Sequence, residues 1–164
     1  MEAKPGGEEG ACHALRESST YLQDSSFHHS GLSFYGAPWT PFHRYECSAF
    51  ASAGGDVIRE HWMRIPSEID VLIVHGPALG RGDFCKRNFH AGCPELLHEI
   101  QRRIHPRLVV HGHIHEGYGN NSFDGHTLFI NAALLYRRNR ESMNSPIVVD
   151  VPLDKSEPAR LVSP

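Results

Sequence analysis

Histidines follow two apolar segments of the sequence, and in each case a glycine adjoins them. Residues 71–74 (VLIV) lead into His75 and Gly76, and residues 108–110 (LVV) lead into the sequence HGHIH at 111–115. Neutral imidazole is the commonest protein ligand for zinc, iron, manganese and similar ions. The types and spacing of these residues therefore predict divalent metal binding by three side chains: His75, His113 and His115.

The position of these histidines at strand ends indicates how they come together. Sites in open α/β sheets form beyond the carboxyl ends of the strands, so both clusters are expected at one edge of a sheet. Residues two apart in an extended chain project to the same side, which predicts that His113 and His115 point together while Ile114 faces the core. His111 is expected to pack or to support the ligands rather than to bind metal.

A bland interpretation of the histidines is that they are polar residues satisfied at a strand end. That interpretation is adequate for a single histidine, but the trio at two strand ends favours a metal site. No other catalytic motif competes with it, because the sequence lacks a G-x-S-x-G elbow, a phosphate-binding loop, a G-x-G-x-x-G turn and an H-E-x-x-H helix.

The elements that must position these residues alternate between strand-like and helical patterns, which predicts an α/β fold. The helices are expected at 56–64 and 94–104, the second with Pro94 at its first position and leucine and isoleucine at helical spacing. The strands are expected at 20–23, 32–35, 71–74, 108–110, 127–134 and 146–151, with a turn at 24–31 that contains two histidines.

The 164 residues suit one domain, and the net charge of −3 argues against nucleic-acid binding through bulk positive charge. We expect a disordered leader at 1–19, a domain at 20–153 and a polar tail at 154–164. No apolar run is long enough for a membrane helix and no signal segment is seen, so a cytoplasmic protein without a membrane partner is expected. The four cysteines make no C-x-x-C pair, which favours reduced thiols.

These motifs together resemble a known family. The sequence HGHIH resembles the G-H-x-H motif of the calcineurin-like metallophosphoesterase superfamily, and LIVHGP resembles the strand-end histidine motif that precedes it. The resemblance is closest to the small eukaryotic metallophosphoesterase-domain-containing proteins. It extends from Tyr21 to Leu153 and rests on the segments YLQDS, YGAPWTP, VHGPALG, GCPEL, IHEGYG and INAA.

The resemblance implies an αββα sandwich of mixed sheets flanked by helices, with a two-metal phosphoesterase site. In such a site the paired ions hold phosphoryl oxygens and activate water. By this resemblance His75 and His113 are ligands of one ion, His115 is a ligand of the other, and Asn131 is a substrate-binding residue near the pocket rim. The implied cofactor is Mn, Fe or Zn, and the implied substrate is a phosphate ester or a nucleotide.

The sequence departs from the family pattern before its first matching segment. It lacks the D-x-H, G-D and G-N-H motifs that supply the other ligands, the bridging carboxylate and the catalytic histidine. We therefore expect only the C-terminal half of the domain, an uncovered face or edge on the strands at 71–74 and 108–110, at most one bound ion, and no assignable catalytic residue.

Two alternatives to an enzyme stay open. The first is a truncated isoform or fragment without catalytic activity that binds at most one metal ion or a nucleotide. The second is a structural zinc module that uses His113, His115 and either Cys85 or Cys93.

Overall fold

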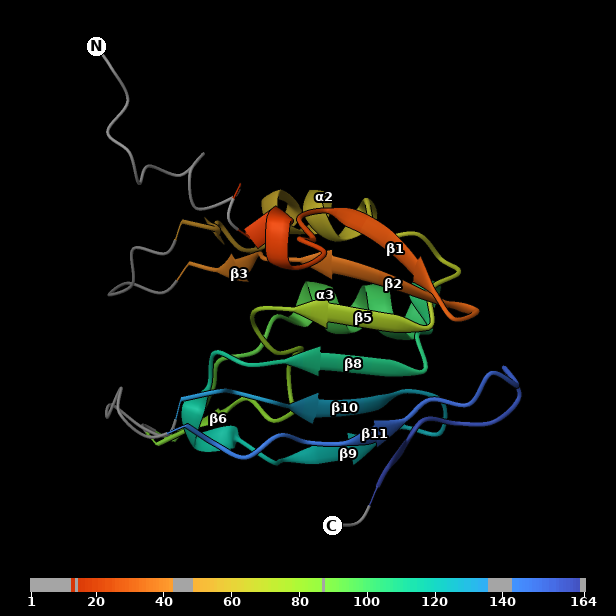
Figure 1. Cartoon of the computed structure of the whole chain (residues 1–164). Coiled ribbons are helices and arrows are strands. Elements are labelled where there is room, and N and C mark those ends of the chain that lie inside the picture. Colours follow the sequence, from red (N-terminus) through yellow and green to blue (C-terminus); the bar gives the residue numbers. More distant parts are fainter. Residues whose placement is uncertain (1–12, 14, 43–48, 87, 136–142, 163–164) are drawn as a thin grey trace.

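The computed structural model describes residues 13, 15–42, 49–86, 88–135 and 143–162. Its centre is a six-stranded sheet in the order β1-β2-β5-β8-β10-β9 (Figure 1). Strands β2, β5, β8 and β10 run parallel, and β1 and β9 pair antiparallel at the two edges. The strands of this sheet are Ser25–His29 (β1), Leu32–Ala37 (β2), Val71–Val74 (β5), Leu108–His111 (β8), Asn121–Phe123 (β9) and Leu128–Asn131 (β10).

Helices and two-residue strands complete the described structure, and the expected α/β class is confirmed. None of the helices in the described residues is long and apolar enough to cross a membrane. Besides the helical residues 15–18, the helical elements are Asp56–Met63 (α2), Pro94–Glu99 (α3), the π-helix Ile100–Ile104 (η1) and the 3-10 helix His115–Gly117 (η2). The short strands are Thr40–Pro41 (β3), Ala51–Ser52 (β4), Phe84–Cys85 (β6), Phe89–His90 (β7), Val149–Asp150 (β11) and Arg160–Leu161 (β12).

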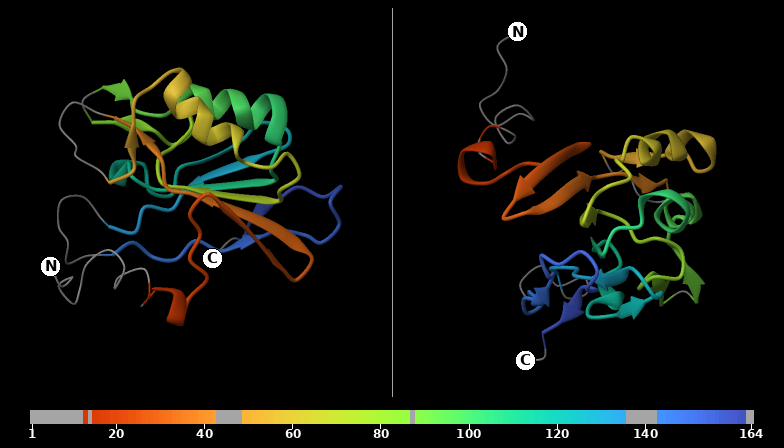
Figure 2. Two further views of the ribbon diagram at one scale, coloured as in Figure 1. Left: turned by 90° about the horizontal axis from the view of Figure 1, so that it is seen from above. Right: turned by 90° about the vertical axis from the view of Figure 1, so that its right-hand side faces the viewer.

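Helices α2 and α3 cover the same face of the sheet (Figure 2). Pro94 occupies the first turn of α3, and the Cys93 thiol accepts a hydrogen bond from the Leu96 backbone N–H at 3.4 Å. The helix continues through η1 and ends at His105, which is left-handed with φ 48°. The expected helix at 94–104 is therefore confirmed, with a wider π-helical winding over its last five residues. The buried core between helices and sheet includes Ile58, Trp62, Leu72, Leu96, Ile100, Val109 and Phe129.

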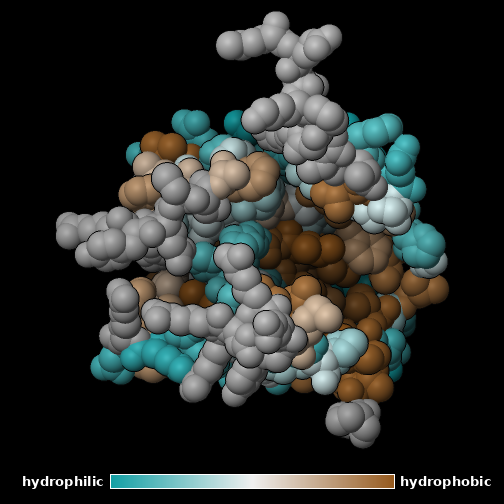
Figure 3. Space-filling model, turned by 60° about the vertical axis from the view of Figure 1, so that its left-hand side comes forward, coloured by the Kyte–Doolittle hydropathy of each residue, from teal (hydrophilic) through white to brown (hydrophobic). Residues whose placement is uncertain are grey.

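The opposite face of the sheet is covered only in part, as expected. Ile73 lies in the middle of β5 between two parallel neighbours, yet its side chain is 41% exposed. The space above it is an apolar groove of about 500 Å³, seen as a brown hollow in Figure 3. We call this the apolar groove; its lining is Leu32, Phe34, Val71, Ile73, Leu108, Val110, Val149 and Val151.

The N-terminal strands differ from the sequence-based expectation. The strand predicted at 20–23 is absent, and the predicted turn at 24–31 contains strand β1, which pairs with β2 in register Ser25–Gly36. The reversal occurs at Ser30 and Gly31, whose φ values of 49° and 81° are those of a tight two-residue hairpin turn. The histidines at 28 and 29 therefore belong to a strand.

The last strands also depart from the expected bounds, and the expected division into leader, domain and tail stays a prediction. Residues 1–12 of the predicted leader lie outside the described residues, and residues 15–18 are helical. The strand predicted at 127–134 is shorter, at Leu128–Asn131, and of the one predicted at 146–151 only Val149–Asp150 forms. Part of the predicted polar tail, Arg160–Leu161, pairs with that last strand.

A buried ion pair fixes the ends of β5 and β8 that lie away from the histidines. The Asp70 carboxylate accepts hydrogen bonds from Arg107 Nη2 at 3.0 Å and from the Ser33 backbone N–H and hydroxyl at 2.8 Å each. Arg107 Nη1 also donates to the carbonyl oxygens of Pro152, Asp154 and Glu157. This cluster connects the starts of three strands to the C-terminal segment.

Candidate metal centre

The carboxyl ends of β5, β8 and β10 meet at one edge of the sheet, where their arrowheads end together in Figure 1. The parallel register pairs Ile73 with Val110 and His111 with Asn131. His75 follows β5 directly, and His111 and Asn131 are the last residues of β8 and β10. The strand-end histidines therefore share one edge, as the sequence predicted.

Two of the three predicted ligands contact each other at this edge. His75 Nε2 lies 3.0 Å from His113 Nδ1, and the two rings are inclined by 60° with their centroids 4.8 Å apart. The backbone supports this approach, because the Gly112 N–H donates to the His75 carbonyl oxygen at 3.0 Å. His113 itself has a φ of 65°, a left-handed conformation that is uncommon for a residue with a side chain.

That backbone conformation changes where His115 lies. The chain is not extended after His111, because His113 is left-handed and His115 begins the 3-10 helix η2. The expectation that His113 and His115 point together through two-residue alternation was therefore based on the wrong geometry, although Ile114 is buried as predicted. Among the residues that the structure describes, no group of three His, Cys, Asp or Glu side chains could hold a metal ion.

The pair of imidazoles fits part of a metal coordination sphere. Two histidine nitrogens bound to one ion at about 2.0–2.1 Å lie roughly 3.0–3.4 Å apart. The separation of 3.0 Å between His75 Nε2 and His113 Nδ1 matches this range. These two residues could hold one ion, and the place of His115 in the ligand set stays a prediction.

Acidic residues near this edge already have partners. The buried Asp83 carboxylate lies 2.7 Å from His90 Nδ1 and accepts hydrogen bonds from the backbone N–H groups of Gly80 and Gly92. Burial raises the pKa of Asp83, but these partners outweigh it and leave the pKa below its ordinary value. Glu116 accepts the Lys86 backbone N–H at 2.9 Å, which is the main cause of its lowered pKa.

His111 is buried beside these groups and remains neutral. Its side chain is 3% exposed, and neither ring nitrogen has a hydrogen-bond partner among the described residues. Burial lowers the pKa of His111 to about 4. The ring packs against Gly82, where an added Cβ would lie 3.2 Å from His111 Cε1. The packing role expected for His111 is consistent with this environment.

Asn131 is placed at the sheet edge but has no exposed surface. Its Nδ2 donates to the carbonyl oxygens of Ile114 and Gly82, at 2.9 and 3.0 Å, and its Oδ1 accepts the Ala133 N–H at 3.0 Å. The sequence predicts a glycine-rich loop at 77–92 but not its contact with this amide through Gly82, because a glycine-rich segment with a single aspartate carries no pattern that indicates its partner. Asp83 and His90, which hold that loop, were not predicted.

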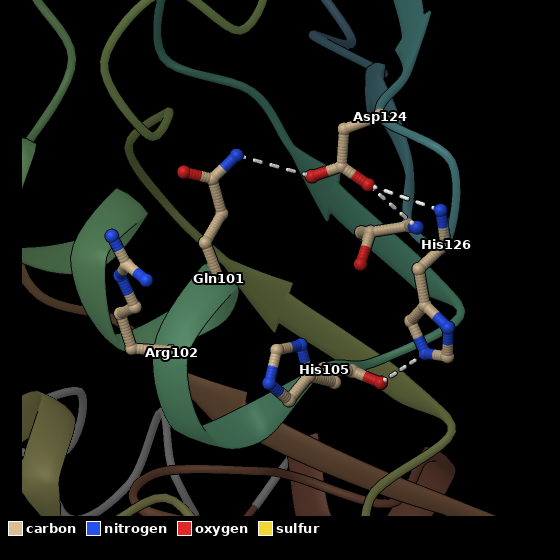
Figure 4. Close-up of a pocket in the computed structure, with 6 residues that line it drawn as sticks. Gln101, Arg102, His105, Asp124 and His126 are labelled. Atoms are coloured by element: carbon tan, nitrogen blue, oxygen red, sulfur yellow. Dashed lines mark hydrogen bonds between the residues drawn. The ribbon is translucent and has the colours of Figure 1, made fainter.

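A separate polar pocket of about 350 Å³ lies at the opposite end of the sheet, away from the histidine edge (Figure 4). Its polar groups bind one another: Asp124 accepts hydrogen bonds from Gln101 and from the backbone N–H groups of His126 and Thr127, and the His126 ring bonds to the His105 carbonyl oxygen. These contacts close the turn between β9 and β10, so they account for the cluster without a ligand.

Comparison with known proteins gives relatives for most of the chain, while no protein-family model matches it. Metallophosphoesterase domain-containing protein 1 of Homo sapiens is 42% identical over 144 residues, which are 87% of this chain and 43% of that protein. A UPF0046 protein of Caenorhabditis elegans is 40% identical over 143 residues, 85% of this chain and 49% of its own length. Another is 37% identical over 139 residues, 85% of this chain and 34% of its own. The chain therefore spans less than half the length of these relatives.

Proposed function

Because the chain belongs to the metallophosphoesterase-domain protein family over the part that it spans, we propose that its histidine edge is one side of a phosphoesterase metal centre. The observation that carries this proposal is the approach of His75 Nε2 to His113 Nδ1 at 3.0 Å, at the carboxyl ends of two parallel strands. We infer that these two imidazoles bind one divalent ion, Mn, Fe or Zn, and that His115 contributes from the adjacent turn.

A divalent ion at this edge would supply a Lewis acid that polarises a phosphoryl oxygen and acidifies a bound water. The residues of this chain contribute neutral nitrogen donors, and the acidic side chains beside them are engaged: Asp83 by His90 and Glu116 by Lys86. Without a carboxylate to offset the repulsion between two cations, the described residues suit one ion rather than two. No residue of this chain is assigned as a catalytic acid, base or nucleophile.

The proposed reaction is hydrolysis of a phosphate ester, such as a phosphodiester or a nucleotide, in the cytoplasm. We propose that this reaction belongs to the longer family proteins, of which the chain spans under half the length. The alternative is a truncated isoform or fragment without catalytic activity that binds at most one metal ion or a nucleotide.

The third candidate, a structural zinc module, is disfavoured by Cys93. This residue is only 1% exposed and lies in the hydrophobic core between the helices and the sheet. The Cys93 sulfur already has a partner, because it accepts a hydrogen bond from Trp62 Nε1 at 3.3 Å. Cys85, the other candidate, lies 3.7 Å from the Asp83 carbonyl oxygen in its own hairpin.

Metal titration of the purified chain tests the proposal. Isothermal titration with Mn²⁺ should give one site or fewer per chain, and His75→Ala and His113→Ala should each weaken it at least tenfold. His98→Ala is the matched control, because His98 is an exposed histidine on the surface of α3. Equal binding by all variants would contradict the site. If the chain alone hydrolyses bis-p-nitrophenyl phosphate and His113→Ala abolishes this activity, the residues of this chain are sufficient for hydrolysis.

A further inference from the structure

The Asn131 side chain joins two loops that meet at the histidine edge. The side chain extends from the end of β10. Its Nδ2 donates one hydrogen bond to the Ile114 carbonyl oxygen at 2.9 Å and one to the Gly82 carbonyl oxygen at 3.0 Å. Its oxygen accepts the Ala133 N–H at 3.0 Å. Since the side chain is fully buried, these backbone groups leave it no surface for a substrate to contact.

We propose that Asn131 is a positioning residue that fixes the backbone between His113 and His115 for metal binding. This inference rests on the proposed metal centre. Ile114, whose carbonyl oxygen Asn131 holds, is the residue between the two histidines. His113 is held left-handed with φ 65°, a strained conformation for a residue with a side chain that persists only when its surroundings enforce it. The Asn131 amide is a buried group placed to enforce it.

The second carbonyl extends this control to the neighbouring loop. Gly82 leads into Asp83, whose carboxylate holds the backbone N–H groups of Gly80 and Gly92 at 3.0 and 2.9 Å. The contact is close: a Cβ added at Gly117 would lie 2.5 Å from the Gly82 carbonyl oxygen and 2.7 Å from Asn131 Nδ2. The loop is therefore pressed against the turn that carries His115, with the Asn131 amide between them.

A purely structural role is the competing explanation, and the same strand provides a control for it. Thr127 lies just before β10 at its other end, is 2% exposed, and donates its hydroxyl to the Pro106 carbonyl oxygen at 2.6 Å. Thr127→Val and Asn131→Asp each remove buried donors to backbone carbonyls while changing little volume. They differ in their distance from the histidine edge.

The experiment measures Mn²⁺ affinity by titration calorimetry, melting temperature, and long-range ¹H–¹⁵N spectra of the histidine rings in the metal-free chain. Asn131→Asp should weaken Mn²⁺ binding about 10- to 100-fold, the usual effect of losing a residue that orients metal ligands. It should also shift the ring signals of His113 and His115 and leave those of His98 unchanged. Thr127→Val should lower the melting temperature and keep the wild-type Mn²⁺ affinity and ring signals.

Unchanged affinity and ring signals in folded Asn131→Asp would overturn the inference, and so would an equal loss of affinity in Thr127→Val. If the wild-type chain binds no Mn²⁺, the proposed function fails, and the ring spectra alone then decide whether Asn131 positions the two histidines. Where Asn131→Asp does not fold, Asn131→Ser, which keeps one smaller donor, is measured in the same way and judged by the same outcomes.

Discussion

Replacement of Asp70 by asparagine should destabilise the chain strongly, because it leaves a buried arginine without its counter-charge. The side chains of Asp70 and Arg107 are 5% and 6% exposed and lie 3.0 Å apart. Removing one partner of a buried ion pair costs about 3–5 kcal/mol, a large fraction of the roughly 5–15 kcal/mol that holds an ordinary domain folded. For a chain of this size, that corresponds to a loss of about 6–20 °C in melting temperature.

The effect should also depend on pH. Burial raises the pKa of Asp70, but the Ser33 N–H and hydroxyl, Lys155 and Arg107 outweigh it and hold the pKa below its ordinary value. A carboxyl group with a depressed folded-state pKa stabilises the fold above its unfolded pKa of about 3.9, and this contribution is lost as pH falls through the folded-state pKa. The difference between wild type and Asp70→Asn should therefore be full above about pH 5 and shrink in stronger acid.

Urea unfolding followed by circular dichroism, at neutral pH and in acid, measures both effects. Asp150→Asn is the matched control, because Asp150 pairs with Arg160 at 3.0 Å with side chains 46% and 62% exposed. An exposed pair of this kind contributes about 0–1 kcal/mol. A loss below about 1 kcal/mol in Asp70→Asn, or a loss that does not change with pH, would refute the reasoning.

Three further predictions concern the groove, a buried thiol and a close glycine. Ile73→Thr should reduce binding of a hydrophobic dye to the folded chain. It should lower the free energy of unfolding in urea by only about 0.5 kcal/mol, because Ile73 is 41% exposed. Unchanged dye fluorescence would show that the apolar groove is not the surface that binds the dye. Cys93 should resist iodoacetamide until the chain unfolds, since the pKa of its thiol is about 12 and the residue is 1% exposed. Mass spectrometry of the labelled peptide, in buffer and in urea, tests this prediction. Rapid labelling in buffer would be inconsistent with the described burial. Gly76→Ala should lower the free energy of unfolding by about 1–3 kcal/mol, measured by thermal unfolding, because the new Cβ would lie 2.8 Å from Thr40 Oγ1. The double variant with Thr40→Ala should recover most of this loss. If it recovers none, the strain does not arise from the contact with Thr40.

The apolar pattern of the sequence was sufficient to predict the central strands and the edge where their histidines meet. Val71–Val74 and Leu108–His111 are strands, and they end where the histidines begin, because runs of buried β-branched residues carry a strong signal. The partly uncovered face was among the expectations drawn from the resemblance, and the 41% exposure of Ile73 within β5 agrees with it.

Local backbone conformation is what sequence reasoning could not supply. Ser30 and His113 both have positive φ values, a choice that only their surroundings impose on residues with side chains. Ser30 closes a two-residue hairpin turn where a hairpin with a longer connection at 24–31 was expected, and His113 ends the extended geometry assumed for HGHIH. Asn131 was predicted at the sheet edge from resemblance, but its burial depends on the Gly82 loop, which lies 49 residues away in the sequence.

The apolar groove determines how the heat capacity of this chain should respond to unfolding and to association. Exposure of apolar surface is the main positive contribution to the heat-capacity change of unfolding. Side chains such as Ile73, already 41% exposed in the folded state, contribute less of that change than those of a closed core. The chain should therefore unfold with a heat-capacity increment below that of an ordinary domain of 164 residues. A macromolecule that covers the apolar groove would bury this surface, so its binding should show a negative heat-capacity change. Calorimetric titration at several temperatures would measure that change.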